Sequence, residues 1–314
     1  MKVIEHLDRA KNPLFSYEII PPIRGRNASE LIEIVSALEP LHPPFIDVTS
    51  HSAEAQYEEL PDGTIHRKIK KKRPGTVSIC GIIQNRFKID TVAHLLCNGF
   101  TREETEDAII ELNYLGIQNV LAIHGDAVNY RKKIADDRSV NQYTSQLVKQ
   151  ISDLRKGQFL DEIDDADPID FCIGVGGYPE KHFESPNLNM DLRYLKAKID
   201  AGADYIVTQM FFDNQHFFDF EKRCREAGIT VPIIPGLKIL SNSKQLTSIP
   251  KYFHIDIPDT FTKEILENRQ YSKTIGLEWA TKQVADLLAH GVKNVHFYIM
   301  NSTKSVSQLV KTFL

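Results

Sequence analysis

The strongest constraint on the fold of this chain is a regular alternation of short apolar runs with longer helical patterns. The apolar runs are rich in β-branched and aromatic residues and almost continuously hydrophobic, which favours parallel strands covered by helices. One helical pattern starts at a capping box formed by Thr101 and Glu104 and ends at Gly116. The eight predicted strands span residues 14–20, 45–50, 76–83, 119–124, 170–176, 205–212, 232–240 and 294–300.

Eight strand–helix units in 314 residues predict an α/β fold of the (β/α)8 or TIM barrel class, and an open doubly wound sheet is the alternative. We favour the barrel because a polar or glycine-rich loop follows each predicted strand. No break in composition divides residues 1–314, so we expect a single domain. Long insertions or connections are predicted at 52–75, 127–138, 156–168 and 241–272.

The composition is typical of a soluble protein, with 42% hydrophobic and 25% charged residues. The net charge of −4 gives no general attraction to nucleic acid or to anionic membranes. The charged N-terminus does not resemble a signal peptide, and no apolar run approaches the roughly 20 residues that span a bilayer. Four cysteines without a CxxC pair are typical of free thiols. We therefore expect a cytoplasmic protein with no nucleic-acid or membrane partner.

The first predicted strand contains a carboxylate in an unusual place. In LFSYEIIPP (14–22), Glu18 lies between Tyr17 and Ile19, and two prolines end the run. A buried charge is costly unless it is paired or neutralised. Either Glu18 faces outward, or its apolar neighbours raise its pKa and keep it protonated near pH 7, as a general acid requires.

In a barrel of this class, functional side chains lie at the C-terminal ends of the strands. The predicted ends are rich in polar and aromatic groups, which a face that serves only stability would not need. These groups are Glu18, Asp47, Thr49, His51, Gln84, His124, Asp126, Tyr178, His182, Gln209, Asp213, Tyr298 and Asn301.

Three other features have simpler interpretations. The stretch GVGGYP (174–179) lacks the GxGxxG spacing and a helix directly after it, so it does not indicate a nucleotide-binding loop. Several histidines lie near strand ends, but the first strand has no HxH and no HExxH occurs, so we expect no metal site. The basic run RKIKKKR (67–73) lies in an insertion of an acidic protein and is interpreted as a solvated loop rather than a polyanion-binding patch.

Several stretches together resemble the methylenetetrahydrofolate reductase family in order and approximate spacing across essentially the whole chain. They are FSYEIIPP, DVTS, HLLC, LAIHGD, GGYPEKH, DLRYLKAKIDAGADYIVTQMFFD, IIPGLKIL and VHFYIMN. The resemblance implies a barrel that holds FAD over residues 1–314 and reduces 5,10-methylenetetrahydrofolate to 5-methyltetrahydrofolate with NADH or NADPH. It also implies a homo-oligomer, and a bacterial-type enzyme without the C-terminal domain of eukaryotic members.

The resemblance assigns roles to individual residues. It implies that Glu18 is the general acid and that Asp126 lies beside the flavin pyrimidine ring and the folate pterin. It implies flavin contacts for Thr49, His94, Tyr178, His182, Asp191 and Lys198. It implies contacts to folate or nicotinamide for Gln209, Gln245 and Tyr298.

The chain departs from the family pattern at three positions. His124 stands where the family usually has Arg beside the FAD phosphates, and imidazole lacks the permanent charge and fork of a guanidinium. Ser302 stands where many members have Arg, so a contact to the folate tail is in question. Ile249 stands where some members have a Phe that stacks on the substrate.

Alternative functions stay open at this point. One is another flavin-dependent barrel oxidoreductase, of the proline dehydrogenase type, and another is a barrel that binds a folate or a partner chain without catalysis. The choice between NADH and NADPH also stays open, because the chain has no Rossmann unit whose side chains would distinguish the 2′ position of the nucleotide.

Overall fold

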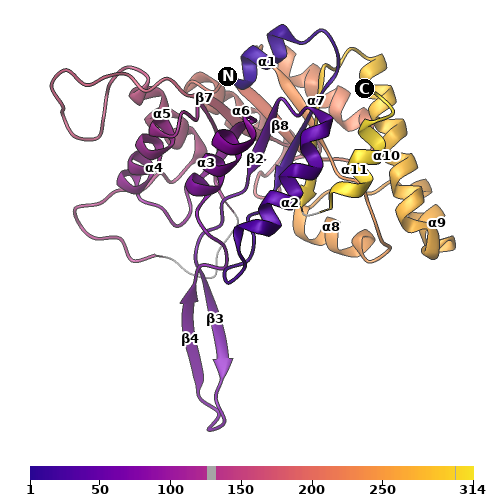
Figure 1. Cartoon of the computed structure of the whole chain (residues 1–314), viewed down its shortest axis with the longest axis horizontal. Helices are drawn as coiled ribbons and strands as arrows, with labels where there is room; N and C mark the ends of the chain where they lie inside the picture. The colour runs from indigo at the N-terminus through magenta and orange to yellow at the C-terminus, as the bar shows by residue number, and fades with distance from the viewer. Residues whose placement is uncertain (126–131, 301) are drawn as a thin grey trace.

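The computed structural model describes residues 1–125, 132–300 and 302–314, and its central feature is a closed barrel of parallel strands (Figure 1). Around the barrel the strands follow the order β1, β2, β5, β6, β7, β8, β9 and β10, and β10 pairs with β1 to close it. The predicted (β/α)8 class is confirmed. The barrel strands are β1 Leu14–Ile19, β2 Phe45–Val48, β5 Asp90–Leu96, β6 Asn119–Ile123, β7 Cys172–Gly177, β8 Tyr205–Met210, β9 Ile233–Leu237 and β10 Asn294–Met300.

Helices lie between successive barrel strands along the chain. The predicted capping box at the start of α4 is confirmed: the Thr101 N–H donates to Glu104 Oε2 at 2.9 Å, and the Glu104 N–H donates to Thr101 Oγ1 at 3.1 Å. The helices are α1 Val3–Arg9, α2 Ala28–Leu38, η1 Glu39–Leu41, α3 Thr76–Phe87, α4 Arg102–Tyr114, α5 Thr144–Leu154, α6 Leu188–Asp200, α7 Asn214–Glu226, α8 Gln245–Phe253, α9 Asp259–Glu267, η2 Arg269–Tyr271, α10 Ser272–Ala289 and α11 Thr303–Val310.

The strand predicted at residues 76–83 is wrong, because that segment belongs to α3 and the third barrel strand is β5. Its buried side chains, Thr76, Ile79, Cys80 and Ile83, recur at the three- and four-residue spacing of a helix face. The prediction that Gln84 lies at a strand end is therefore also wrong. Gln84 sits in the last turn of α3, and its Oε1 accepts from the N–H of Thr91 at 3.1 Å, near the start of β5.

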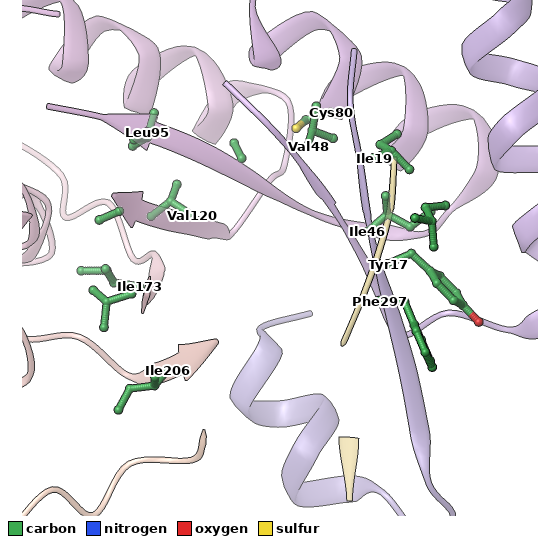
Figure 2. Packing of buried hydrophobic residues seen from close by; sticks show 14 of the residues in the cluster. Tyr17, Ile19, Ile46, Val48, Cys80, Leu95, Val120, Ile173, Ile206 and Phe297 are labelled. Carbon is green, nitrogen blue, oxygen red and sulfur yellow. The ribbon is translucent and has the colours of Figure 1, made fainter. Parts of the chain in front are cut away.

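The main hydrophobic core fills the layer between the barrel strands and the surrounding helices. Outward-facing side chains of alternate strand positions enter this layer, because successive residues of a strand point to opposite faces. Figure 2 shows part of it, including Val48 of β2, Val120 of β6 and Cys80 of α3, all fully buried. The side chains at the other strand positions point inward, where they form the barrel interior and the site at its mouth.

A second apolar cluster fills the N-terminal end of the barrel interior. Val3 of α1 packs there with inward side chains of several strands, among them Phe45, Val92 and Tyr205. The Val3 N–H donates to Asn119 Oδ1 at 2.8 Å, which holds the helix against the barrel. α1 has no counterpart among the elements predicted from the sequence. This end of the barrel is therefore closed by packing, and polar groups concentrate at the other end.

The insertion at 52–75 forms an antiparallel hairpin of β3 (Glu54–Glu59) and β4 (Ile65–Lys70) that projects from the body of the molecule (Figure 1). It leaves from the C-terminal end of β2. At its base the Arg24 N–H donates to the Lys72 carbonyl at 2.8 Å, and the Arg73 side chain contacts the Pro21 carbonyl. The connection at 241–272 likewise contains structure, namely α8, α9 and η2.

Two glycines make room for aromatic rings inside the barrel. A Cβ at Gly236 would lie 2.5 Å from the ring of Tyr298 and 2.3 Å from the Thr208 carbonyl oxygen. A Cβ at Gly174 would lie 2.4 Å from the ring of Tyr205. The first glycine of GVGGYP therefore has a packing role, which agrees with the interpretation that this stretch is not a nucleotide loop.

Candidate active site

Four neighbouring strands bring polar side chains together at the C-terminal end of the barrel. Glu18 of β1 is in register with Tyr298 of β10 on one side and with Asp47 of β2 on the other. Lys238 directly follows β9, whose Leu237 is in register with Phe297 of β10. Residues in register across parallel strands point to the same side of the sheet. These four side chains therefore form one tier of the barrel.

Glu18 lies in this tier with 18% of its side chain exposed. Its Oε2 is 3.7 Å from Nε2 of His94, which projects from β5 and is 3% exposed. Burial raises the pKa of Glu18 to about 7; the positive charges of His94 and Lys238 oppose the rise, and the charge of Asp47 supports it. The Glu18 carboxyl can therefore hold a proton near neutral pH, as the sequence reading proposed.

Asp47 is more deeply buried than Glu18. Its side chain is 1% exposed, and its Oδ2 is 3.4 Å from His94 Nε2. Burial raises the pKa of Asp47 to about 7, and the nearby His296 opposes the rise. Burial also lowers the pKa of His94, which favours the neutral imidazole. The site therefore holds two protonatable carboxyl groups on either side of one imidazole nitrogen.

Lys238 and His296 were not singled out from the sequence. The Lys238 ammonium donates to the Tyr298 carbonyl at 3.1 Å, and burial lowers its pKa while Glu18 raises it. His296 is 1% exposed, and its Nδ1 is 2.9 Å from Ser16 Oγ. The available signal was a lysine or a histidine within an otherwise apolar strand region, in IIPGLKIL and NVHFYIM.

The structure places two of the three predicted substrate residues on one cavity. Gln245 and Tyr298 line a cavity of about 340 Å³ at the ends of β9 and β10, and Ser302 also lines it. The Tyr298 hydroxyl donates to the Thr208 carbonyl at 2.6 Å, and Gln245 Oε1 accepts from the Ser241 N–H at 2.7 Å. The remaining lining residues are Lys238, Ile239, Ser241, Phe297, Ile299, Ser305 and Val306.

The other substrate-related positions lie apart from that lining. Gln209, near the end of β8, accepts from the Met210 N–H through its own Oε1 at 2.9 Å. Ile249 of α8 is 3% exposed and packs in a separate apolar cluster with Phe212 and Phe261. The isoleucine at position 249 is therefore part of the packing under α8 in this structure.

The predicted flavin residues on β7 and α6 form a connected group. The rings of Tyr178 and His182 meet edge to face with their centroids 4.5 Å apart. Asp191 Oδ1 accepts from the Ser185 hydroxyl at 2.7 Å, and its Oδ2 accepts from the His182 N–H at 3.2 Å. Lys198 donates to the Gly176 carbonyl at 2.6 Å, and burial lowers its pKa to about 8.

His124 and Thr49 extend this group toward the glutamate. His124 Nδ1 is 3.5 Å from Asn98 Nδ2, and His124 also acts electrostatically on His182. Thr49 follows β2, and its buried hydroxyl has no hydrogen-bond partner among the described residues. These adjoining strand ends offer groups that fit a flavin. The hydroxyl, the imidazoles and the lysine can donate hydrogen bonds, and the phenol ring offers a stacking surface. Asp126, the other residue predicted beside the flavin, lies outside the described residues.

Within residues 1–125, 132–300 and 302–314, no group of three or more His, Cys, Asp or Glu side chains could hold a metal ion. In the same part of the chain, no helix has the length and apolar character to cross a membrane.

A closed parallel barrel with its polar and titratable groups gathered at the C-terminal strand ends defines a (β/α)8 enzyme scaffold. The family model of methylenetetrahydrofolate reductase matches residues 2–313. The chain therefore belongs to the methylenetetrahydrofolate reductase family, a family of folate-metabolising oxidoreductases, as the sequence motifs predicted.

Relatives from eukaryotes and bacteria match at similar identity but over different shares of their length. Methylenetetrahydrofolate reductase 1 of Schizosaccharomyces pombe is 29% identical over 98% of this chain and 47% of its own length. A probable methylenetetrahydrofolate reductase (NADH) of Oryza sativa is 31% identical over 97% of this chain and 49% of its own. The 5,10-methylenetetrahydrofolate reductase of Salmonella typhimurium is 30% identical over 91% and 86%. The chain thus spans about half the length of these eukaryotic relatives and most of the bacterial one.

Solved structures support the fold alone. A Clostridium thermocellum protein, described as binding two copies of 5-methyl-5,6,7,8-tetrahydrofolic acid, has a TM-score of 0.58 at 14% identity, with 98% of this chain and 96% of that chain covered. A phosphoenolpyruvate phosphomutase of Streptomyces platensis has a TM-score of 0.50 at 14% identity, with 99% and 84% covered.

Proposed function

We propose that this chain catalyses the reduction of 5,10-methylenetetrahydrofolate to 5-methyltetrahydrofolate, with FAD as its cofactor and NADH or NADPH as the electron donor. The observation that carries the proposal is Glu18 at the mouth of the barrel, in a chain of this family, with a pKa raised by burial to about 7. The fold places that acid at the end of the barrel where enzymes of this class bind their substrates.

Glu18 would act on the folate itself. The five-membered ring of methylenetetrahydrofolate must open to an iminium before it can accept a hydride, and opening needs a proton at a weakly basic ring nitrogen. An ordinary exposed Glu is almost fully ionised at pH 7. A carboxyl group that burial keeps protonated can donate from Oε2 to that nitrogen at neutral pH.

The residues along β2, β5, β6, β7 and α6 would hold FAD. When bound, FAD accepts a hydride from NAD(P)H and later passes it to the folate. Thr49 would donate its hydroxyl, which has no partner within the part of the chain that the structure describes, and Lys198 would supply positive charge. The other residues proposed to hold the cofactor are His94, His124, Asp126, Tyr178, His182 and Asp191.

The opposite side of the mouth would orient the folate and the nicotinamide. Gln245 and Tyr298 share the cavity at β9 and β10, so they can bind one molecule together. Gln209 on β8 lies between that cavity's strands and β7, which carries Tyr178 just beyond its end. We propose that Gln209, Gln245 and Tyr298 contact substrate. As the family resemblance implies, we also propose that residues 1–314 form one FAD-binding unit that acts as a homo-oligomer. From the cysteine pattern, we propose that it acts in the cytoplasm.

Spectroscopy of the purified protein tests this function. The protein, as isolated or after incubation with FAD, should show oxidised-flavin bands at about 370 and 450 nm. NADH or NADPH should bleach them, and methylenetetrahydrofolate should restore them under anaerobic conditions with formation of 5-methyltetrahydrofolate. A protein that cannot be reconstituted with FAD contradicts the proposal. So does a reduced protein that a quinone reoxidises and methylenetetrahydrofolate does not.

A further inference from the structure

One imidazole nitrogen lies between two carboxyl groups in this site. His94 Nε2 is 3.4 Å from Asp47 Oδ2 and 3.7 Å from Glu18 Oε2. The two carboxyl groups come from adjacent strands and are in register, so the barrel itself sets their separation. A nitrogen of this kind carries one proton at most and can donate it to one carboxylate at a time.

Three arrangements of one proton over this group have the same net charge. The proton can sit on Glu18, on His94 or on Asp47, and each arrangement leaves one negative charge in total. Removing the proton would leave two carboxylates beside a neutral ring, in a place where Asp47 is 1% and His94 is 3% exposed. Two like charges this close and this poorly hydrated strongly disfavour joint ionisation.

Each of the two carboxyl groups has its own cationic neighbour. The positive charge of Lys238 favours the ionised form of Glu18, and a positive charge on His296 favours the ionised form of Asp47. Within the described part of the chain, Asp47 Oδ1 has no hydrogen-bond partner, so His94 is the polar contact that the structure gives this carboxyl. Among the described residues, the titratable groups that interact electrostatically with Glu18 or Asp47 are His94 on β5, Lys238 beyond β9, His296 and Tyr298 on β10, Tyr205 on β8 and Cys80 on α3.

We propose that Asp47 is a positioning residue for the reaction: it shares one proton with Glu18 across His94, and its negative charge strengthens the hold of Glu18 on that proton. The proposal rests on the proposed role of Glu18 as the acid. During ring opening, the O–H bond of Glu18 breaks and an N–H bond forms on the folate. Two neighbouring carboxylates are then left, and their repulsion draws the next proton from water onto Glu18, whose side chain is the more exposed of the two.

Carboxyl titration in the absence of substrate tests the sharing directly. Protein labelled with 13C at the Asp and Glu carboxyl carbons, kept in the form in which it purifies, would be titrated by NMR from pH 5 to 9. In wild type, the Glu18 and Asp47 signals should each follow the same two coupled steps. In Asp47→Asn, the step that Glu18 shares with Asp47 should disappear, and Glu18 should titrate at least about one pH unit lower, a tenfold change in its proton affinity. Single-step titration of both wild-type carboxyls would overturn the proposal.

Asp90→Asn is a matched control. Asp90 begins β5, and its Oδ2 is 2.8 Å from His6 Nε2, so the variant also removes a carboxylate beside a histidine. Because Asp90 and Glu18 lie at opposite ends of the barrel, the Glu18 titration should stay as in wild type. If Asp90→Asn shifts Glu18 as far as Asp47→Asn does, the effect is general and the proposal fails. If Asp47→Asn does not fold, the reciprocal variant Glu18→Gln provides the test. In that variant, Asp47 should lose the step that it shares with Glu18, and its pKa should fall by the same amount.

A kinetic measurement distinguishes failure of this proposal from failure of the proposed function on which it rests. In Asp47→Asn, the alkaline limb of folate-dependent flavin reoxidation should move to lower pH by the shift seen in NMR, while flavin reduction by NAD(P)H keeps its pH profile. If wild type reduces folate but Asp47→Asn leaves the Glu18 titration unchanged, the sharing is refuted and the function stands. If the titrations couple as expected but wild type does not reduce folate, the sharing stands and the proposed function falls.

Discussion

Replacing Glu18 with Gln tests the role of the acidic proton alone, because the amide keeps the size of the side chain and cannot donate an acidic proton. The pKa of about 7 means that about half of the molecules carry the proton at pH 7. At the ordinary pKa of 4.5, about one molecule in 300 would do so. Burial therefore raises the population of the acid form at pH 7 by roughly 150-fold.

The two half-reactions should respond differently to Glu18→Gln. Reoxidation of the reduced flavin by methylenetetrahydrofolate should fall about 10²–10⁴-fold, as is usual for loss of a general acid. Reduction of the flavin by NAD(P)H needs no protein acid and should stay within about tenfold of wild type. Stopped-flow absorbance at the flavin band measures both rates, and a quinone serves as the acceptor that has no ring to open. Equal slowing of both halves would refute the acid role and assign Glu18 to cofactor positioning.

The same substitution should change stability with a defined pH dependence. The folded-state pKa of Glu18 lies above its unfolded value, so the folded protein loses stability as pH rises from about 4.5 through about 7. Glu18→Gln removes this loss. The variant should resemble wild type at pH 5 and be more stable by roughly 1–3 kcal/mol at pH 8. Denaturant unfolding at the two pH values measures the difference, and an unchanged or lower stability at pH 8 would show that Glu18 is better solvated than its burial indicates.

Three further variants test other parts of the site and the fold. His124→Arg should bind FAD about three- to tenfold more tightly, because a permanent charge can pair with phosphate; a dissociation constant equal to that of wild type would place position 124 away from the phosphates. In wild type, the affinity for FAD should decline as the Lys198 ammonium, with a pKa of about 8, deprotonates. Lys198→Met should bind FAD more weakly at pH 7 and should show no such decline. Fluorescence titration with FAD from pH 6.5 to 9 measures this, and parallel pH profiles would contradict it. Replacing Lys70 and Lys72 with Met should leave turnover and its salt dependence nearly unchanged and cost less than about 1 kcal/mol of unfolding free energy, since the Lys72–Glu54 pair lies on the exposed hairpin. A several-fold rise in the KM for polyglutamylated folate, with the monoglutamate unaffected, would instead make the basic run a substrate contact.

The alternation of apolar runs with helical patterns was sufficient to predict the barrel, because each unit must bury one face of its helix on its strand. It was insufficient at residues 76–96. TVSICGII is apolar enough to read as a strand, but its buried positions recur at helical spacing. The true strand, DTVAHLL, contains an Asp and a His, which interrupt the apolar pattern expected of a barrel strand. Burial on one face distinguishes the two, and a short window of sequence does not show which face is buried.

The residues of the candidate site also differ in how far the sequence alone reveals their role. Glu18 could be identified from the sequence because its immediate neighbours are apolar, and that property is local. Lys238 and His296 also have apolar neighbours, but their effect on the two carboxyl groups depends on strands that lie far apart in the sequence. Lys238 acts on Glu18 from 220 positions away, through the neighbour relation of β9, β10 and β1. Register across the closed barrel determines which charges meet, and the local pattern of each strand carries little information about it.

The position of the titratable tier follows from how the barrel is closed. At the N-terminal end, α1 and an apolar cluster close the barrel interior, so a carboxylate inside the barrel there would have no route to water. At the C-terminal end, loops and the hairpin leave Glu18 partly exposed while Asp47, one strand away, is almost fully buried. A general acid needs both conditions, since burial must keep it protonated and access to water must return the proton after each turnover. The change from buried to exposed across two adjacent strands meets both needs within one tier, and it supports the proposal that Glu18, and not Asp47, touches the substrate.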